Sequence, residues 1–148
     1  TLNDRYYLED EHKQHDSRWL HRPRMNWDRA ARRNKHGSIE NRIFMPLKKM
    51  IAVRKEIPAF ADHNNRELLD ADNPHLFVFS RFDYINTQSR VLVICNFDNR
   101  PQQLDIAGLC KRGFFQHGKA RDLYSGNDIN IDCQQLEIPP LGFYWLQT

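Results

Sequence analysis

Cysteine is scarce in this sequence, and no metal-binding pattern accompanies it. The 148 residues include three cysteines, Cys95, Cys110 and Cys133, and they form no CxxC pair. Neither a disulfide framework nor a cysteine-rich zinc site is therefore indicated. The seven histidines form no HExxH or HxxxH pattern, so we expect no metal and no other cofactor. Three reduced thiols would be typical of a cytoplasmic protein, and we expect that localisation.

Long apolar runs are also absent. No stretch approaches the roughly 18 consecutive apolar residues of a membrane span, so we expect no membrane partner. The first residues contain neither an initiator methionine nor an apolar signal segment, and we expect the chain to come from a longer or processed polypeptide. An apolar fraction of 40% and a charged fraction of 28% exclude a disordered tail, a collagen-like repeat and a coiled coil.

Positive charge is concentrated in residues 18–36, which hold six arginines and one lysine against the single Asp28. Such a basic stretch is a candidate for binding phosphates. However, Trp19, Met25 and Trp27 are interleaved with the basic residues, and the stretch matches no nucleic-acid-binding motif. We therefore expect no nucleic-acid partner.

Residues 38–57 carry the one strong helical pattern. Ser38 is a suitable N-cap, and Pro58 should end the helix. Pro46 lies inside the pattern and predicts a kink or a split there. The apolar residues at helical spacing are Ile39, Ile43, Phe44, Leu47, Met50 and Ile51. Residues 1–37 are polar and irregular, with a short helix expected at about 27–33.

Beyond Phe60 the pattern changes to period two. Short strands, separated by turn signals, are expected at 66–69, 75–81, 90–97, 101–106, 120–122, 134–138 and 142–146. Many short strands with evenly spaced turns favour an antiparallel β-sandwich. We therefore predict a mainly β fold, with loop and helix in residues 1–60 and the sandwich in residues 61–148. We assign Phe77, Phe79, Phe97, Phe143 and Trp145 to its core.

The densest group of chemically capable side chains lies in residues 15–27. Arginine binds a carboxylate through two parallel hydrogen bonds, and an indole ring offers a flat apolar face that suits the C–H face of a pyranose. Asp16 and Asn26 can hydrogen-bond hydroxyl groups. Together these residues would equip a sugar pocket. The alternative is that Asp16 and the arginines form local salt bridges and the two tryptophans are core residues.

The stretch Asp16-Ser17-Arg18-Trp19-Leu20-His21-Arg22-Pro23-Arg24-Met25-Asn26-Trp27 closely resembles amylosucrases. These enzymes are sucrose-acting members of the α-amylase superfamily, glycoside hydrolase family 13. Residues 75–79, 91–97, 122–126 and 136–146 are similar to the C-terminal β-sandwich of that superfamily. The resemblance implies that residues 1–60 are the last loop and closing helix of a catalytic (β/α)8 barrel. It also implies that residues 61–148 are an amylase-type domain C.

The resemblance further implies a parent enzyme that transfers glucose from sucrose to an α-1,4-glucan by a retaining mechanism. The two carboxylates of such an enzyme lie about 5–5.5 Å apart and would precede Thr1, so we expect no catalytic residue in this chain. The family has an arginine that closes the pocket around the glucosyl unit. Arg22 matches it best, Arg18 and Arg24 are alternatives, and Asp16 is placed in the same substrate-binding group.

Other functions stay open. The parent could be a sucrose or α-glucan hydrolase of the same family, and the sandwich could be a non-catalytic module that stabilises the barrel or binds glucan weakly. The expected partners are sucrose and α-glucan, through the parent enzyme, and the catalytic barrel of the same polypeptide. In the isolated chain the helix face Ile39, Ile43, Leu47 and Ile51 would be uncovered, and we expect self-association through it.

Overall fold

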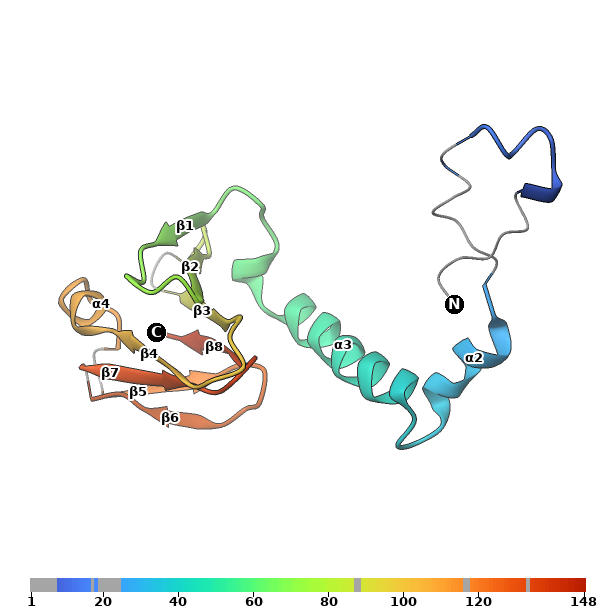
Figure 1. Ribbon diagram of the computed structural model, residues 1–148. Helices are drawn as coiled ribbons and strands as arrows, with labels where there is room; N and C mark the ends of the chain where they lie inside the picture. Colours follow the sequence, from blue (N-terminus) through green and yellow to red (C-terminus); the bar gives the residue numbers. More distant parts are fainter. Residues whose placement is uncertain (1–7, 17, 19–24, 87–88, 116–117, 133) are drawn as a thin grey trace. The chain divides into compact units, whose positions relative to one another are not determined.

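The computed structural model describes residues 8–16, 18, 25–86, 89–115, 118–132 and 134–148. The chain divides into two compact units, one reaching to Lys48 and one running from Lys49 onward. The first unit holds the short helix α2 (Trp27–Ala31), the 3-10 turn η2 (Arg32–Asn34) and the first part of helix α3 (Ile39–Glu56), as Figure 1 shows. The rest of α3 and all of the strands belong to the second unit.

Helix α3 begins where the sequence predicts. The Ser38 hydroxyl accepts a hydrogen bond from the backbone N–H of Asn41 at 3.1 Å, so the N-cap assignment is confirmed. The helix continues through Pro46 over 18 residues, and the predicted split is therefore wrong. Proline at this position removes one backbone hydrogen bond, to the Arg42 carbonyl. Residues 42–49 are all exposed, so water can hydrogen-bond that carbonyl instead.

The short helix α2 confirms the expectation of helical structure near residues 27–33. Its N-cap is Asn26, whose Oδ1 accepts from the backbone N–H of Arg29 at 2.8 Å. An ion pair joins it to the start of α3, because Arg29 Nε lies 3.0 Å from Glu40 Oε1. Glu40 also lies 3.5 Å from Arg32 Nε. These local contacts organise the first unit.

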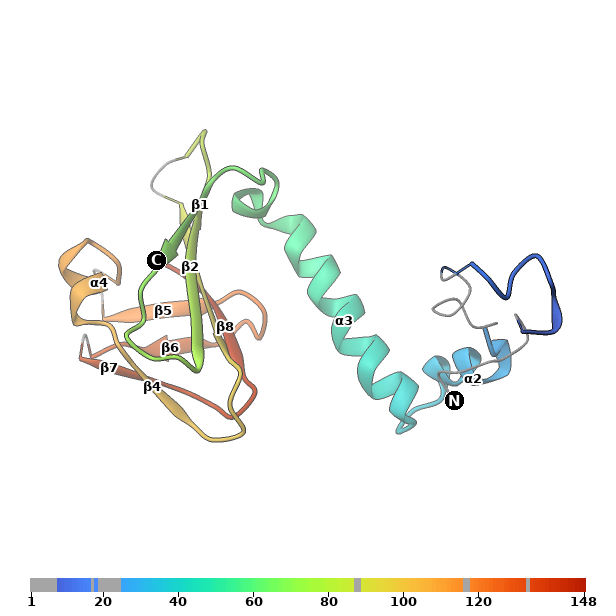
Figure 2. The same ribbon diagram turned by 45° about the horizontal axis from the view of Figure 1, so that its top comes forward.

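The second unit consists of two antiparallel sheets. The larger has the strand order β1-β2-β3-β8-β5-β6, and the smaller pairs β4 with β7 (Figures 1 and 2). The strands of the larger sheet are β1 (Arg66–Leu69), β2 (Leu76–Phe82), β3 (Arg90–Asn96), β5 (Lys119–Asp122), β6 (Asp128–Asn130) and β8 (Phe143–Gln147). The smaller sheet comprises β4 (Gln102–Asp105) and β7 (Gln135–Ile138), and the short helix α4 (Ala107–Lys111) follows β4. The predicted mainly β, antiparallel fold class is therefore confirmed.

The main core lies between the two sheets. Leu92 and Ile94 of β3 alternate toward it and are fully buried, as is Ile138 of β7. Leu104 of β4 and Leu136 of β7 complete the contribution of the smaller sheet. Because side chains alternate across a strand, burial of both inner faces makes the second unit a two-layer sandwich.

A second apolar cluster covers the other face of the larger sheet. Phe60, from the 3-10 turn η3 (Pro58–Phe60), packs against Trp145 of β8, with ring centroids 5.0 Å apart. Met50 and Val53 of α3 also pack against this cluster. These contacts attach the C-terminal part of α3 to the sheet. Removing a buried aromatic ring such as that of Phe60 lowers the free energy of unfolding by about 3–5 kcal/mol.

Candidate functional site

The predicted substrate-binding residues Asp16 and Arg18 contact each other directly. Arg18 Nη2 donates to Asp16 Oδ2 at 2.7 Å, and Arg18 Nε lies 3.0 Å from both carboxylate oxygens. The backbone N–H of Arg18 also donates to Asp16 Oδ1 at 3.0 Å. This local pair matches the salt-bridge alternative for Asp16. The hydrogen bonds that Arg18 donates to the Asp16 carboxylate raise the pKa of its guanidinium.

The other two arginine candidates, Arg22 and Arg24, lie outside the described residues. Of the consecutive acids Glu9, Asp10 and Glu11, the two glutamates are exposed, and Asp10 Oδ2 lies 2.6 Å from Lys13 Nζ. The bond to Lys13 lowers the pKa of Asp10.

In the described part of the chain, no group of three or more histidine, cysteine or acidic side chains is placed to hold a metal ion. None of the helices in the same residues has both the length and the apolar character of a membrane span.

A ring of polar side chains joins the turn before β2 to the loop after β3. The Asn73 side chain donates to Gln102 Oε1 at 3.0 Å, and the Gln102 side chain donates to Asp98 Oδ2 at 2.8 Å. Asp98 Oδ2 lies 3.7 Å from His75 Nδ1. The backbone N–H of His75 donates to Asn73 Oδ1 at 3.0 Å and closes the ring.

Asn96 holds the loop beneath this ring. It is buried, and its side-chain amide donates to the carbonyls of Arg100 at 2.8 Å and Pro139 at 2.9 Å. Its Oδ1 accepts from the backbone N–H of Asp98 at 2.8 Å. Buried polar groups that are fully hydrogen-bonded make a structure rigid, so Asp98 is held in a fixed position.

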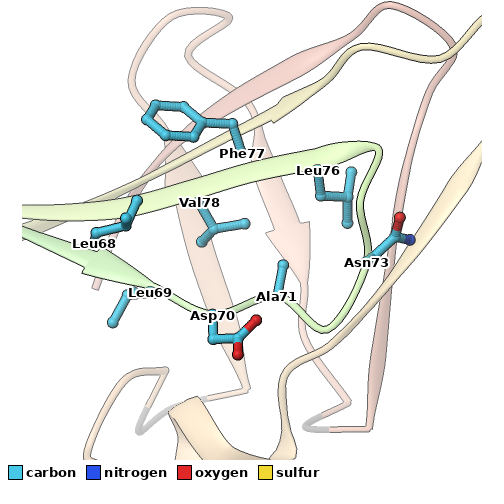
Figure 3. Close-up of a pocket in the computed structure, with 8 residues that line it drawn as sticks. All are labelled: Leu68, Leu69, Asp70, Ala71, Asn73, Leu76, Phe77 and Val78. Atoms are coloured by element: carbon cyan, nitrogen blue, oxygen red, sulfur yellow. The ribbon is translucent and has the colours of Figure 1, made fainter.

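Two aromatic side chains next to the ring are exposed. Phe97 is 73% exposed and Phe77 is 46% exposed, so their assignment to the core is wrong. The alternation of β2 places Phe77 opposite to the buried Val78, and Figure 3 shows the two side chains on opposite sides of the strand. Phe97 follows the last residue of β3, beyond the part of the sheet that α3 covers with Met50 and Val53. The burial of Trp145 is as predicted.

A pocket of about 480 Å³ lies beside these residues. It is lined by residues 68–71, 73 and 76–78, which come from β1, the following turn and the start of β2 (Figure 3). Asn73 and Phe77 therefore belong both to the pocket wall and to the exposed aromatic and polar group. A volume of this size falls within the range of small-molecule sites.

The sequence alone does not reveal this group, because its members are distant along the chain. Asn73 and Gln102 are 29 residues apart, and the pairing of β2 with β3 brings the turn before β2 close to the chain that follows β3. One local signal was present. Phe97 directly precedes the turn residues Asp98-Asn99-Arg100, and an aromatic residue at the end of a strand is less protected than one within it.

The cysteine expectation also needs a correction. Cys95 carries a free thiol, but Cys110 is disulfide-bonded, so three reduced thiols are not present. The spacing of cysteines along the chain gave no indication of this bond. A disulfide depends on the approach of two Cβ atoms in the folded chain.

The chain is similar to known proteins in both sequence and fold. Residues 66–145 match the family model described as maltogenic amylase, C-terminal domain. Among solved structures, a pullulanase from Anoxybacillus sp. LM18-11 complexed with maltotriose is 19% identical, with a TM-score of 0.54 over 83% of this chain and 16% of its own. A type I pullulanase from Bacillus subtilis complexed with maltose is 16% identical, with a TM-score of 0.52 over 87% of this chain and 17% of its own.

A third similar structure is the trehalose-6-phosphate hydrolase of Bacillus licheniformis. It is 19% identical, with a TM-score of 0.52 over 88% of this chain and 22% of its own. The chain thus spans about a fifth or less of the solved chains that it matches. Identities this low show a shared fold, whereas the family model covers more than half of the sequence. The chain therefore belongs to the family of maltogenic amylase C-terminal domains of glycoside hydrolase family 13.

Proposed function

We propose that this chain is the C-terminal part of a sucrose-acting glucosyltransferase of the amylosucrase type. In this proposal the β-sandwich supports a catalytic barrel of the same polypeptide, which supplies the reactive carboxylates. The observation that carries the proposal is the order of two features. An amylosucrase-like stretch at residues 16–27 precedes, in one chain, a domain of the maltogenic amylase C-terminal family at residues 66–145.

The contacts of Arg18 support Arg22 as the arginine that closes the glucosyl pocket. The Arg18 guanidinium forms three hydrogen bonds of 3.0 Å or less to the adjacent Asp16. An arginine bound in this bidentate way already has its carboxylate partner. We therefore propose that Arg18 and Asp16 shape the loop, while Arg22 contacts the sugar and a carboxylate of the barrel.

One further observation supports an α-glucan as the acceptor or product, and a second supports the catalytic barrel as the partner of α3. The pullulanases that share this fold were solved with maltotriose and maltose, which are short α-glucans. The second is the apolar face of α3, where Ile39, Ile43 and Leu47 are 64%, 65% and 51% exposed. Apolar surface of this kind marks an interface, and we propose that the barrel covers it.

The test of the proposed function is an assay of the full-length protein with sucrose. Release of fructose together with a growing α-1,4-glucan is the expected result. Release of fructose and free glucose alone would support the sucrose hydrolase instead. Hydrolysis of malto-oligosaccharides without any attack on sucrose would overturn the proposal and favour the α-glucan hydrolase.

Arginine variants of the same protein test the assignment within the loop. We expect Arg22→Ala to lower kcat/KM for sucrose by roughly 100-fold, because misplacing a bound substrate by about 1 Å can cost that much. Arg42→Ala, which removes an exposed arginine of α3, is the matched control and should leave kcat/KM unchanged. If Arg18→Ala rather than Arg22→Ala caused the large loss, the two roles would have to be exchanged.

The exposed α3 face predicts the behaviour of the 148-residue chain alone. Without a barrel, we propose that a second copy covers this face and that the chain elutes as a dimer or larger species. Ile43→Glu should then restore a monomer, whereas Lys48→Glu, which changes an exposed charge in the same helix, should not. Monomeric elution of the unmodified chain would rule out this self-association.

A further inference from the structure

We propose that the exposed group around Phe97 is a binding surface for α-glucan chains on the β-sandwich itself. The two phenylalanine rings would stack on glucosyl units, and the polar ring of Asn73, His75, Asp98 and Gln102 would hydrogen-bond their hydroxyl groups. The choice of α-glucan among polyhydroxyl ligands rests on the proposed function. The location of the surface rests on the contacts of the described residues.

The aromatic part of the surface is set by strand register. The backbone N–H of Phe97 donates to the His75 carbonyl at 2.9 Å, and Phe77 pairs with Cys95 one step further along the sheet. Phe97 and Phe77 are therefore diagonal neighbours on one face, at a separation of roughly 7–8 Å. One short oligosaccharide spans such a distance and could contact both rings.

The two rings stay exposed although they lie next to the second apolar cluster, with the ring centroid of Phe77 5.3 Å from that of Phe79. A phenylalanine side chain stabilises a protein through the apolar area that it buries, and Phe97 leaves 73% of its surface in solvent. Phe79 and Phe143, on the same face, pack against the second apolar cluster. An exposed apolar group rimmed by polar side chains is typical of a binding site.

The polar part of the surface suits a neutral ligand. Two of its four side chains, Asn73 and Gln102, are amides, and the imidazole of His75 lies beside the carboxylate of Asp98. Amides and imidazole both donate and accept hydrogen bonds, which is what the hydroxyl groups of a sugar require. A phosphate or carboxylate ligand would instead need a cluster of cations, and none is part of this group.

The surface is already ordered, so binding requires little rearrangement. The side chains of Asn73, Gln102 and Asp98 are linked by hydrogen bonds, and Asn96 fixes the loop from below through hydrogen bonds to the carbonyls of Arg100 and Pro139. A preformed site avoids the entropy cost of ordering side chains on binding.

Affinity electrophoresis of the full-length protein in gels that contain glycogen tests this proposal. We expect Phe97→Ala to bind glycogen about threefold to tenfold more weakly than the unmodified protein, which is the effect expected for one aromatic contact. Phe97→Trp should retain the binding, since it keeps a ring at the same position. The matched control is Tyr84→Ala, which removes an exposed ring from the opposite end of the β2–β3 hairpin and should migrate like the unmodified protein.

Several outcomes would overturn the proposal. One is that glycogen retards Phe97→Ala as strongly as the unmodified protein. Another is that a gel of mixed-linkage β-glucan retards the unmodified protein as strongly as a glycogen gel does. The third is that glycogen does not retard the unmodified protein at all. A loss of oligomeric state in Phe97→Ala without a change in glycogen binding would identify a protein contact instead. Because retardation is measured without sucrose or turnover, this test and the sucrose assay can fail independently.

Discussion

Asp122 Oδ1 accepts a hydrogen bond from the backbone N–H of Trp145 at 3.0 Å, so the last residue of β5 is tied to the middle of β8. The second oxygen, Oδ2, accepts from the backbone N–H of Ser125 at 3.0 Å. The residue is only 4% exposed. One buried carboxylate thus joins the turn after β5 to the sheet that carries the second apolar cluster.

We predict that Asp122→Ala lowers the free energy of unfolding by about 2 kcal/mol. The substitution leaves the buried N–H of Trp145 without its acceptor, and an unsatisfied buried donor costs roughly 1–3 kcal/mol. Urea unfolding followed by tryptophan fluorescence measures the difference. Asp128→Ala, which removes an exposed carboxylate of β6, should change the unfolding free energy by less than about 0.5 kcal/mol.

A second prediction concerns Asn96, whose side-chain amide donates to three carbonyl oxygens, those of Arg100, Ile138 and Pro139. Asn96→Asp keeps the shape but replaces the donor with a carboxylate oxygen. We expect it to lower the free energy of unfolding by roughly 2–4 kcal/mol, because a buried charged acceptor would face other acceptors. Asn99→Asp, at an exposed position in the same loop, is the control. Equal urea midpoints for the two variants would contradict the assigned hydrogen bonds.

The parts of the fold that the sequence predicts are those with strong local signals. Helix α3 was predicted from Ser38 and the spacing of its apolar residues, and its cap is confirmed by the bond to Asn41. Strand β3 was predicted from a run of β-branched and apolar residues, and it spans Arg90–Asn96. In both cases the pattern repeats with the period of the element, so tertiary structure is not needed to recognise it.

Other elements have no such pattern. Strand β6 has only three residues, of which Asp128 and Asn130 are of types that favour turns, so the sequence predicts no strand there. It forms only because β5 lies alongside it. Helix α4 (Ala107–Lys111) has only five residues, too few to show a helical repeat of apolar residues, and it begins without a side-chain cap. The sequence therefore contains no signal for the start of this helix.

The candidate sites show the same difference between contacts that are local in sequence and contacts that depend on tertiary structure. Asp16 and Arg18 are two residues apart, so their salt bridge can be expected from the sequence as a local contact. The group around Phe97 depends on strand pairing and on loops 29 residues apart. Phe97 was expected in the core because the predicted strand, residues 90–97, ends one residue later than β3 does. Where a strand ends depends on its pairing with a neighbouring strand, and the alternation of side chains along one strand does not contain that information.

The start of α3 gives a prediction about acid pH. The backbone N–H of Glu40 itself, and after it the side chain of Arg29, lower the pKa of the Glu40 carboxyl from its ordinary 4.5. A carboxyl whose pKa is lower in the folded than in the unfolded chain stabilises the fold fully above the ordinary value. That contribution is lost as the pH falls through the folded-state pKa. We therefore expect the helix start to weaken below pH 4.5.

NMR titration of the Glu40 carboxyl would measure this directly, with a midpoint below 4.5 expected in the folded chain. Arg29→Ala should move the midpoint upward but not fully to 4.5, because the backbone hydrogen bond remains. Glu40→Gln should remove the corresponding pH dependence of the Asn41 amide shift. A Glu40 midpoint at or above 4.5 would show that neither contact persists in solution.

The two described cysteines should differ in reactivity. Burial raises the pKa of the Cys95 thiol, and a raised pKa lowers the fraction of reactive thiolate at any given pH. We therefore expect iodoacetamide at pH 8 to label Cys95 more slowly in the folded protein than in urea. Cys110 is disulfide-bonded and should be labelled only after reduction. Peptide mass spectrometry with and without reductant separates the two sites, and Cys95→Ser is the control that removes the first signal. Labelling of Cys110 in urea without any reductant would show that the disulfide does not form. That result would again support the expectation of reduced thiols, which are typical of a cytoplasmic protein.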